Sequence, residues 1–405
     1  MTHRSMIIAA AAAAIMSVSA ATAGDYGPGV SDTEIKLGQT IPYSGPASAY
    51  GTIGRIEEAY FNMVNSKGGV NGRKIRMISL DDAYSPPKTV EQTRKLVEQE
   101  EVLAIVGTIG TPTNSATQRY LNAKKVPQIF ISTGAAKWDD PKNFPYTTAL
   151  YPPYQMEGQI FAKYLLKNKP DAKLGVFSQN DDAGKDYVRG LKEGLGDKAA
   201  QMIVKEVTYE TSDPTVDSQI VALKASGADT LFTMATPKFG AQAIRKVAEL
   251  GWTPLNYVVS VSSSITGVLE PAGLTASKGL LTALAFKTAT DPRWNDAKDV
   301  QEFRAFLKEW FPKGDAGDAS NVVGYVAAFM TVKVLQMCGD DLTRDNLMHQ
   351  ATNLTKVEAP LLLPGITITT TPQRYSPYNQ MQIARFDGTS WVPEGPVIST
   401  GELGQ

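Results

Sequence analysis

The sequence has little of the residue types on which metal sites and acid–base catalysis usually depend. Its 405 residues include one Cys and two His. A single Cys, Cys338, excludes an internal disulfide and a cysteine-rich zinc site. A Ser-His-Asp or Cys-His hydrolase would have to use His349, because His3 lies in a segment that we expect to be removed. We expect Cys338 to be a buried apolar residue and His349 to lie on a surface helix.

Excess charge of either sign is also missing. The chain has 40 basic and 41 acidic residues and a formal net charge of −1. Nucleic-acid binding, which needs clustered basic charge, is therefore not expected. The chain contains neither a GxxxxGK[ST] loop nor a GxGxxG motif, so phosphate-bearing cofactors lack their usual cradle. We expect no cofactor and no bound metal.

The first 23 residues are typical of a secretory signal. A short basic start is followed by an apolar run over residues 6–18 and by the small-x-small site Ala21-Thr22-Ala23. The run is shorter than the roughly 20 residues that a membrane-spanning helix needs. We expect cleavage before Gly24 and, because no Cys follows the run, no lipid anchor. The mature protein should be periplasmic.

Strand-like and helix-like segments alternate along the rest of the chain, which predicts an α/β fold with parallel sheets covered by helices. In the first unit, strands are predicted over residues 34–40, 73–80, 102–106 and 128–131, and helices over 50–67, 87–98 and 113–124. In the second unit, strands are predicted over 174–178, 202–209, 230–234, 256–261 and 279–286, and helices over 154–167, 182–195, 214–226 and 237–250. Later helices are predicted over 296–310 and 321–337 and later strands over 366–370 and 381–386, the last of which is followed by a hairpin turn at 387–389.

Ligands of open α/β sheets bind beside the carboxyl ends of the strands, so the loops after the strands are the candidate site. The loop at residues 107–113 combines glycines, Thr111 and a helix start, which favour a carboxylate. Helix capping alone would also explain its threonines. The loop at 132–136 offers small residues and hydroxyls, and Tyr50 has a ring that can stack on an apolar ligand or pack under its own loop.

Two loops of the second unit carry further polar groups. Asp181 and Asp182 follow the strand at 174–178 and would either bind a cationic group or, more commonly, cap the next helix. The loop at 259–264 is rich in hydroxyls and has no charged residue.

Five segments together resemble the periplasmic leucine/isoleucine/valine-binding protein family, the type I solute-binding proteins of ABC importers. They are EIKLGQTIPYSGPASAYG, NSKGGVNGRKIRMISLDDAYSP, VEQEEVLAIVGTIGTPTNSAT, VPQIFIST and QNDDAGKDYVRGLKEGLG. The resemblance covers nearly the whole chain after the signal. It implies two doubly wound α/β lobes joined by a three-crossing hinge, a ligand in the cleft, a membrane permease as partner, a monomer and no enzymatic activity. The implied lobes are residues 24–149 with 284–375, and residues 150–283 with 376–405.

The same resemblance implies the site residues. The loop after the third strand would hold a ligand carboxylate with Ile109, Gly110 and Thr111. The loop after the fourth would contribute Thr133, Gly134 and Ala136. The aromatic residue at the first helix is Tyr50, and Tyr151 would add stacking surface.

Departures from the family pattern bear on the ligand. The loop matching Val259–Ser264, which includes Ser262, lacks the acid that amino-acid-binding members use for the ligand ammonium, and Ala183 replaces an aromatic residue. Burying an ammonium without a counter-charge costs several kcal/mol. We therefore expect a small carboxylate with an aromatic or apolar body and no amine.

Three alternatives remain open at this stage. Asp181 or Asp182 would restore the binding of a branched-chain amino acid. A sensory module that reports to a receptor would have the same sequence features as a transport component. A secreted enzyme that uses carboxylates alone, such as a glycosidase, would need paired acids that converge on the cleft.

Overall fold

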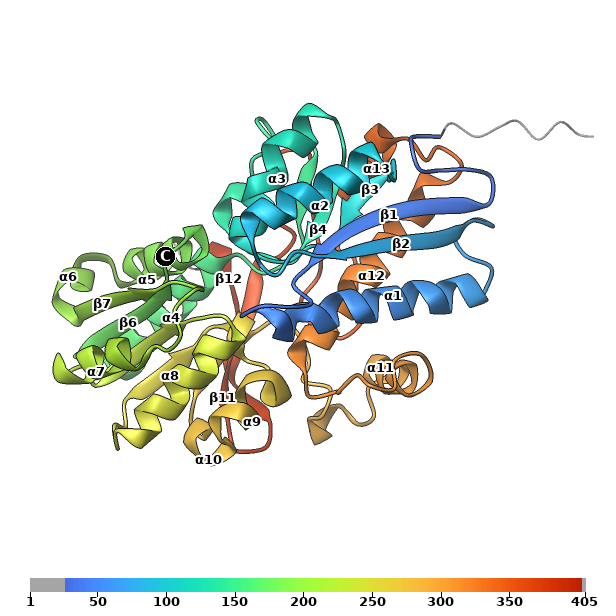
Figure 1. Cartoon of the computed structure of the whole chain (residues 1–405). Coiled ribbons are helices and arrows are strands. Elements are labelled where there is room, and N and C mark those ends of the chain that lie inside the picture. Colours follow the sequence, from blue (N-terminus) through green and yellow to red (C-terminus); the bar gives the residue numbers. More distant parts are fainter. Residues whose placement is uncertain (1–25, 403–405) are drawn as a thin grey trace, which may run out of the picture.

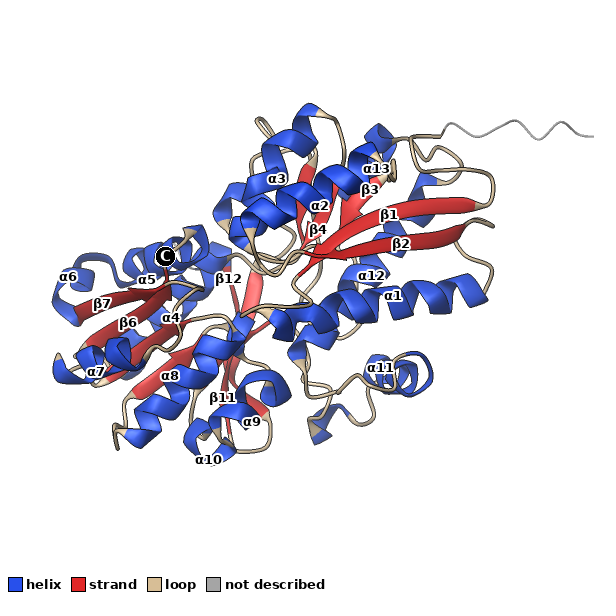
Figure 2. Cartoon of the chain, viewed as in Figure 1, coloured by secondary structure: helices blue, strands red, loops and turns tan. Residues whose placement is uncertain are grey.

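The computed structural model describes residues 26–402, so the expected secretion signal lies outside the described residues. Two separate β-sheets, each flanked by helices, form two lobes (Figures 1 and 2). The predicted fold class is confirmed.

The first sheet has five parallel strands in the order β2-β1-β3-β4-β5. Its central strand β3 (Ala104–Val106) is completely buried, as expected for a parallel strand with helices on both faces. The other strands are β1 (Glu34–Ile41), β2 (Lys74–Asp81), β4 (Gln128–Ile131) and β5 (Thr147–Ala149). The helices of this lobe are α1 (Gly51–Ser66), α2 (Pro86–Glu98), α3 (Thr111–Ala123), α11 (Lys298–Trp310), α12 (Ala319–Cys338) and α13 (Arg344–Ala351).

The second sheet repeats this arrangement and extends it. Its parallel part has the order β7-β6-β8-β9-β10, and the antiparallel hairpin β11-β12 adds an edge. The strands are β6 (Leu174–Gln179), β7 (Ile203–Tyr209), β8 (Thr230–Met234), β9 (Leu255–Val258), β10 (Leu281–Leu284), β11 (Gln380–Phe386) and β12 (Trp391–Ser399). The helices are α4 (Tyr154–Asn168), α5 (Asp182–Leu195), α6 (Ala199–Met202), α7 (Asp217–Ala225), α8 (Pro237–Glu249), α9 (Glu270–Ala272) and α10 (Leu274–Ser277).

Both parallel units therefore share the strand order 2-1-3-4-5. In this order the second strand is added on one side of the first and the later strands on the other side, so the order switches between β1 and β3 in one lobe and between β6 and β8 in the other. Loops leaving two such strands diverge and open a crevice at their carboxyl ends. The topology places one crevice in each lobe.

The longest helix, α12, belongs to the core of the first lobe and packs against α1 (Figure 1). Within residues 26–402 it is the one helix that is long and apolar enough to cross a membrane by length and composition. However, 72% of its most apolar stretch is buried inside the protein, as in a core helix.

Most predicted elements are confirmed to within a few residues, including the hairpin turn between β11 and β12. The strand predicted over residues 366–370 is wrong, because only Ile368 forms an isolated bridge, with Val357. Its apolar side chains, Ile366 and Ile368, are buried in the first-lobe core although the segment joins no sheet. Strands β5 and β12 and helix α13 were not predicted. Cys338 is buried and His349 is exposed on α13, as expected.

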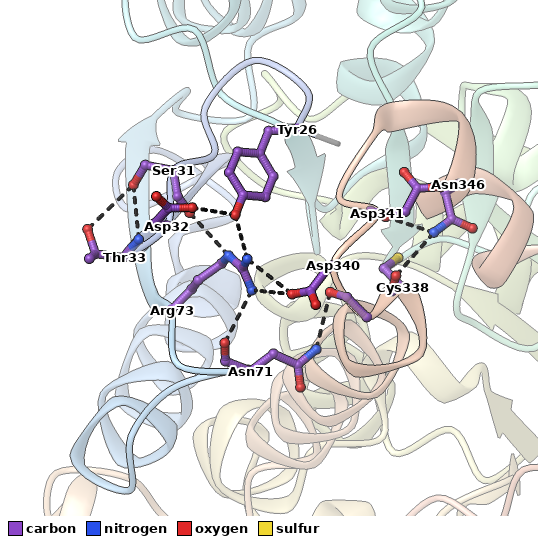
Figure 3. A network of polar contacts seen from close by, with 11 residues as sticks. Tyr26, Ser31, Asp32, Thr33, Asn71, Arg73, Cys338, Asp340, Asp341 and Asn346 are labelled. Atoms are coloured by element: carbon purple, nitrogen blue, oxygen red, sulfur yellow. Dashed lines mark hydrogen bonds and ion pairs between the residues drawn. The ribbon is translucent and has the colours of Figure 1, made fainter. Parts of the chain in front are cut away.

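A polar network fastens the first described residues to the far end of the first lobe (Figure 3). At its centre lies Arg73, which is 6% exposed. The guanidinium donates to the Tyr26 hydroxyl at 2.6 Å and to the carbonyl oxygens of Ser31 and Asn71, each at 3.2 Å. It also pairs at 3.2 Å with Asp340, whose side chain is 81% exposed.

Loss of Arg73 and loss of Asp340 should lower the free energy of unfolding by different amounts. Arg73→Met removes a buried guanidinium that the half-buried Tyr26 hydroxyl and two carbonyls accept from, and should lower the free energy of unfolding by about 2 kcal/mol. Asp340→Ala removes only a solvent-screened partner and should cost less than about 1 kcal/mol. Urea titration of both variants measures the difference, and equal losses would contradict this assignment.

Candidate functional site

A cavity lies between the two lobes, where the carboxyl ends of both sheets face each other. It contains about 610 Å³ of space not filled by atoms, its open mouth included. None of its lining residues carries a charged side chain, and six of the ten predicted site residues are among them: Tyr50, Ile109, Gly110, Thr111, Tyr151 and Ala183. The other lining residues are Ile53, Tyr84, Ser132, Tyr154, Gln179, Met234, Thr236, Ser260, Val261, Ser264, Ala319, Ser320 and Val323.

The first-lobe end of this cavity is the N-terminus of α3. Gly110 precedes the helix with φ 97°, and a Cβ there would lie 2.5 Å from the Tyr84 ring, so the close approach requires glycine. The first backbone N–H groups of a helix have no intrahelical acceptor and carry a partial positive charge. Thr111 adds a hydroxyl, 2.6 Å from that of Thr133. This end of the cavity can therefore accept an anionic group.

Ser132 is a wall residue that the sequence argument did not select, although it belongs to a loop that was singled out. It pairs with Ile109 in an isolated bridge, is 5% exposed and lines the cavity. Its Oγ is buried and has no hydrogen-bond partner among the described residues. A buried hydroxyl without a partner is costly, and a ligand oxygen would satisfy it.

Four predicted site residues lie behind the wall and do not line the cavity. Thr133 accepts from the Trp138 indole at 3.3 Å. A Cβ on Gly134 would lie 2.0 Å from the Pro152 carbonyl, so this glycine allows the segment joining the lobes to pass. The Ala136 amide donates to Asp186 of α5 at 2.8 Å. Ser262 donates its hydroxyl to the Ala235 carbonyl.

Four tyrosines, Tyr50, Tyr84, Tyr151 and Tyr154, form much of the remaining wall. The hydroxyl of Tyr50 donates to the Val261 carbonyl at 3.2 Å, which links the lobes across the cavity. Burial raises the pKa of Tyr50 and Tyr151 well above the ordinary value, so both remain neutral donors. These rings give the cavity aromatic surface without charge.

At the second-lobe end, a buried carboxyl lies one layer behind the wall. Glu157 of α4 is 0% exposed and accepts from the Ser260 amide and hydroxyl, both at 2.6 Å. It also accepts from the hydroxyls of Tyr257 at 3.0 Å and Tyr187 at 3.1 Å. The loop at 259–264 has no acid of its own, but Glu157 reaches it from a helix distant in sequence. No sequence motif marks this residue.

Two more acids support the polar wall in the same way. Asp181 caps α5 by accepting from the Gly184 amide at 2.9 Å, which confirms the capping role, and it also accepts from Gln179 at 2.7 Å. Asp318 accepts from the Ser264 hydroxyl and the Ser320 amide, both at 2.9 Å. Ser260, Gln179 and Ser264 each present a polar group to the cavity with a carboxyl behind it.

The protonation of these acids makes the two ends of the cavity different. Burial raises the pKa of Glu157 to about 7 and that of Asp181 to about 6, while their hydrogen-bond donors oppose the shift. In the first lobe, burial holds the pKa of Glu57 well above its usual range, so that carboxyl is neutral. Near pH 7 negative charge therefore lies behind the second-lobe wall, opposite the positive end of α3.

Metal binding has no structural support within residues 26–402, where no group of three or more His, Cys, Asp or Glu side chains is arranged to hold an ion.

The lobes also touch outside the cavity, for example through the ion pair of Lys137 and Asp182 at 3.3 Å.

The buried carboxyl of Glu157 predicts a pH-dependent stability. Folded Glu157 keeps its proton to about pH 7 whereas the unfolded chain releases it near 4.5, so its contribution to the free energy of unfolding decreases as pH rises between these values. In wild type this decrease in the free energy of unfolding should be about 3 kcal/mol, and in Glu157→Gln it should be absent. Denaturant titrations from pH 4 to pH 8 measure the difference between wild type and variant.

The exposed Glu91 on α2 provides the control. Glu91→Gln should show the same pH dependence of the free energy of unfolding as wild type. A wild-type minus Glu157→Gln difference that stays constant over this range would contradict a protonated buried carboxyl.

Comparisons with known proteins identify the family and the fold. Residues 34–390 match the family described as periplasmic binding protein. A Leu/Ile/Val-binding protein homolog of Brucella suis is 24% identical over 247 residues, which cover 59% of this chain and 61% of the relative. Matches to the first curated relatives span 61–64% of their length, less than two thirds.

Solved structures share the fold. A branched-chain amino acid ABC transporter structure from Thermus thermophilus with bound valine superimposes with a TM-score of 0.82 at 15% identity, covering 92% of this chain and 98% of that one. A solute-binding protein of an ABC transporter from Rhodopseudomonas palustris in complex with 3,4-dihydroxybenzoic acid superimposes with a TM-score of 0.75 at 22% identity. The match covers 91% of this chain and 98% of that one.

Proposed function

Because the chain belongs to the periplasmic binding protein family, we propose that it is the solute-binding component of an ABC uptake transporter and binds a small carboxylate between its lobes. The supporting observation is the start of α3, where helix-end N–H groups, Thr111 and the unpartnered Ser132 hydroxyl face one end of an uncharged cavity.

The body of this ligand is aromatic or apolar. Tyr50, Tyr151 and Tyr154 offer ring faces, and Ala183 leaves room between them and the second lobe. Aromatic rings stack favourably on tyrosine without needing a charged partner. The structural relative that holds 3,4-dihydroxybenzoic acid provides a precedent for such a ligand in this fold.

A branched-chain amino acid is the second candidate, favoured by the carboxyls behind the second-lobe wall. An ammonium at Ser260 would lie within reach of the charge of Glu157, which partly replaces the acid missing from the loop. The valine-bound relative provides the precedent. The two candidates differ in one group, the amine.

The remaining parts of the proposal are supported by family membership and by the sequence of the first 23 residues. The protein acts outside the cytoplasm after removal of residues 1–23, works as a monomer, delivers its ligand to a membrane permease and performs no catalysis. The lobes meet at three crossings, near residues 149–150, 283–284 and 375–376. Closure about these crossings traps the ligand and creates the shape that the permease recognises.

Loss of the first-lobe hydroxyls should weaken carboxylate binding. Thr111→Val and Ser132→Ala should each raise the Kd for a bound acid by about tenfold, because each removes one hydrogen bond to a charged group. Thr117→Val, two turns further along α3 and outside the cavity, is the matched control. Calorimetry that finds unchanged affinity in both cavity variants would contradict the carboxylate anchor.

The pH dependence of binding should separate the two candidates. As pH falls through about 7, Glu157 takes up a proton, and Asp181 follows near pH 6, so an ammonium ligand loses its counter-charge and binds more weakly. A benzoate-type acid should keep its affinity until its own carboxylate protonates near pH 4. Thermal-shift titrations with 4-hydroxybenzoate and leucine at pH 5 and pH 8 measure this. Stabilisation by leucine alone would contradict the aromatic-acid proposal.

A further inference from the structure

A second cavity lies next to the first, on the side where chain segments pass between the lobes. We name it the hinge-side cavity. It contains about 540 Å³ of space not filled by atoms, its opening included. Its lining includes Pro152, which follows the last strand of the first sheet, residues 283–289, which lead out of β10, and Met381 at the start of β11. Two of the three connections between the lobes therefore contribute to it, and Met381 lies in the strand that follows the third.

The wall between the two cavities is thin. Tyr151, Ser260, Ala319 and Val323 line both of them. Ala319 and Val323 are one turn apart on α12 and have short side chains. The Tyr151 hydroxyl bonds to the Ser260 Oγ at 3.2 Å, and its ring packs edge-to-face on Tyr154. Tyr151 therefore stands between the two spaces.

Three polar side chains of the hinge-side cavity, those of Trp391, Ser263 and Lys287, already have partners. The Trp391 indole donates to the Ser263 carbonyl at 2.7 Å, and the Ser263 hydroxyl donates to the Ser260 carbonyl at 2.8 Å. The Lys287 ammonium is paired with Asp299 at 2.7 Å. The surface left to an occupant comes from apolar side chains such as Ile265, Ala285 and Val322. An occupant of this cavity therefore gains from being apolar and needs no polar group.

The geometry points to a subsite for an apolar tail: the carboxylate ligand lies with its acid group at α3, and its hydrocarbon end passes Tyr151 into the hinge-side cavity. This inference rests on the proposed function and adds the substrate class, an acid with an alkyl or phenylalkyl tail. Each methylene buried there should tighten binding by about fourfold.

A chain-length series tests the subsite. Calorimetry with benzoate, 3-phenylpropanoate and 5-phenylpentanoate should show the Kd decreasing by about tenfold or more at each step of two methylenes. A Kd that does not change along the series would overturn the subsite while leaving carboxylate binding intact. If none of the three acids binds, the proposed function fails, and the subsite fails with it.

A filled cavity provides the second arm. Ala316 is half-buried and lines the hinge-side cavity only. Ala316→Phe should bring the affinity for 5-phenylpentanoate down to that for benzoate and leave benzoate binding unchanged, which also reports correct folding. Ala297→Phe, at a half-buried alanine that packs on the same core and lines neither cavity, is the control.

If Ala316→Phe does not fold, Ala316→Leu replaces it, with a smaller loss expected for the longest acid. Undiminished affinity for 5-phenylpentanoate in a folded, filled variant would overturn the inference.

Discussion

The shared direction of parallel strands is the constraint on which the rest of the structure depends. In each lobe, the loops that follow the five parallel strands lie at the carboxyl ends of the sheet. The strand order opens a crevice there, beside the first strand. Because the carboxyl ends of the two sheets face each other, loops separated by about 150 residues, such as those after β3 and β9, line one cavity. The cavity follows from topology, and the loop residues then determine its chemistry.

That chemistry is electrostatic although no charged side chain lines the wall. At one end the positive charge comes from the backbone of α3, and the carboxyl nearest to its loop, Glu57, is neutral because it is buried. At the other end Glu157 and Asp181 lie one layer back and act through Ser260 and Gln179. Asp318, which caps α12 of the first lobe, accepts from Ser264 of the second lobe. An acid placed behind a hydroxyl fixes the direction in which that hydroxyl points, so the wall is polarised without an exposed ion. A ligand with a carboxylate at one end and a hydrogen-bond donor at the other complements both ends.

Sequence reasoning predicted the local features well and the long-range ones poorly. Strands such as residues 230–234 and the cap at Asp181 depend on neighbouring residues, so pattern and spacing were sufficient. The strand predicted over 366–370 was wrong because Ile366 and Ile368 are buried in the core from a segment outside the sheets, and periodicity does not distinguish the two environments.

Site prediction had the same limit. Tyr50, Ile109, Gly110 and Thr111 line the cavity because loop position determines where they lie. Gly134 instead leaves space for the Pro152 carbonyl, which a Cβ would clash with. Ser132, in the same loop, is the residue that lines the cavity. Glu157 lies in the first turn of α4, and its partners come from α5, β9 and the loop that follows β9. Only the folded arrangement shows that a loop without an acid has one behind it.

The central claim is that the cavity between the lobes holds a small carboxylate. Its most direct test is native mass spectrometry of the protein purified without refolding, followed by identification of the small molecule released on denaturation. The account predicts a released organic acid, with an aromatic or other apolar body. Release of a neutral sugar or of a cation without a carboxylate would contradict it.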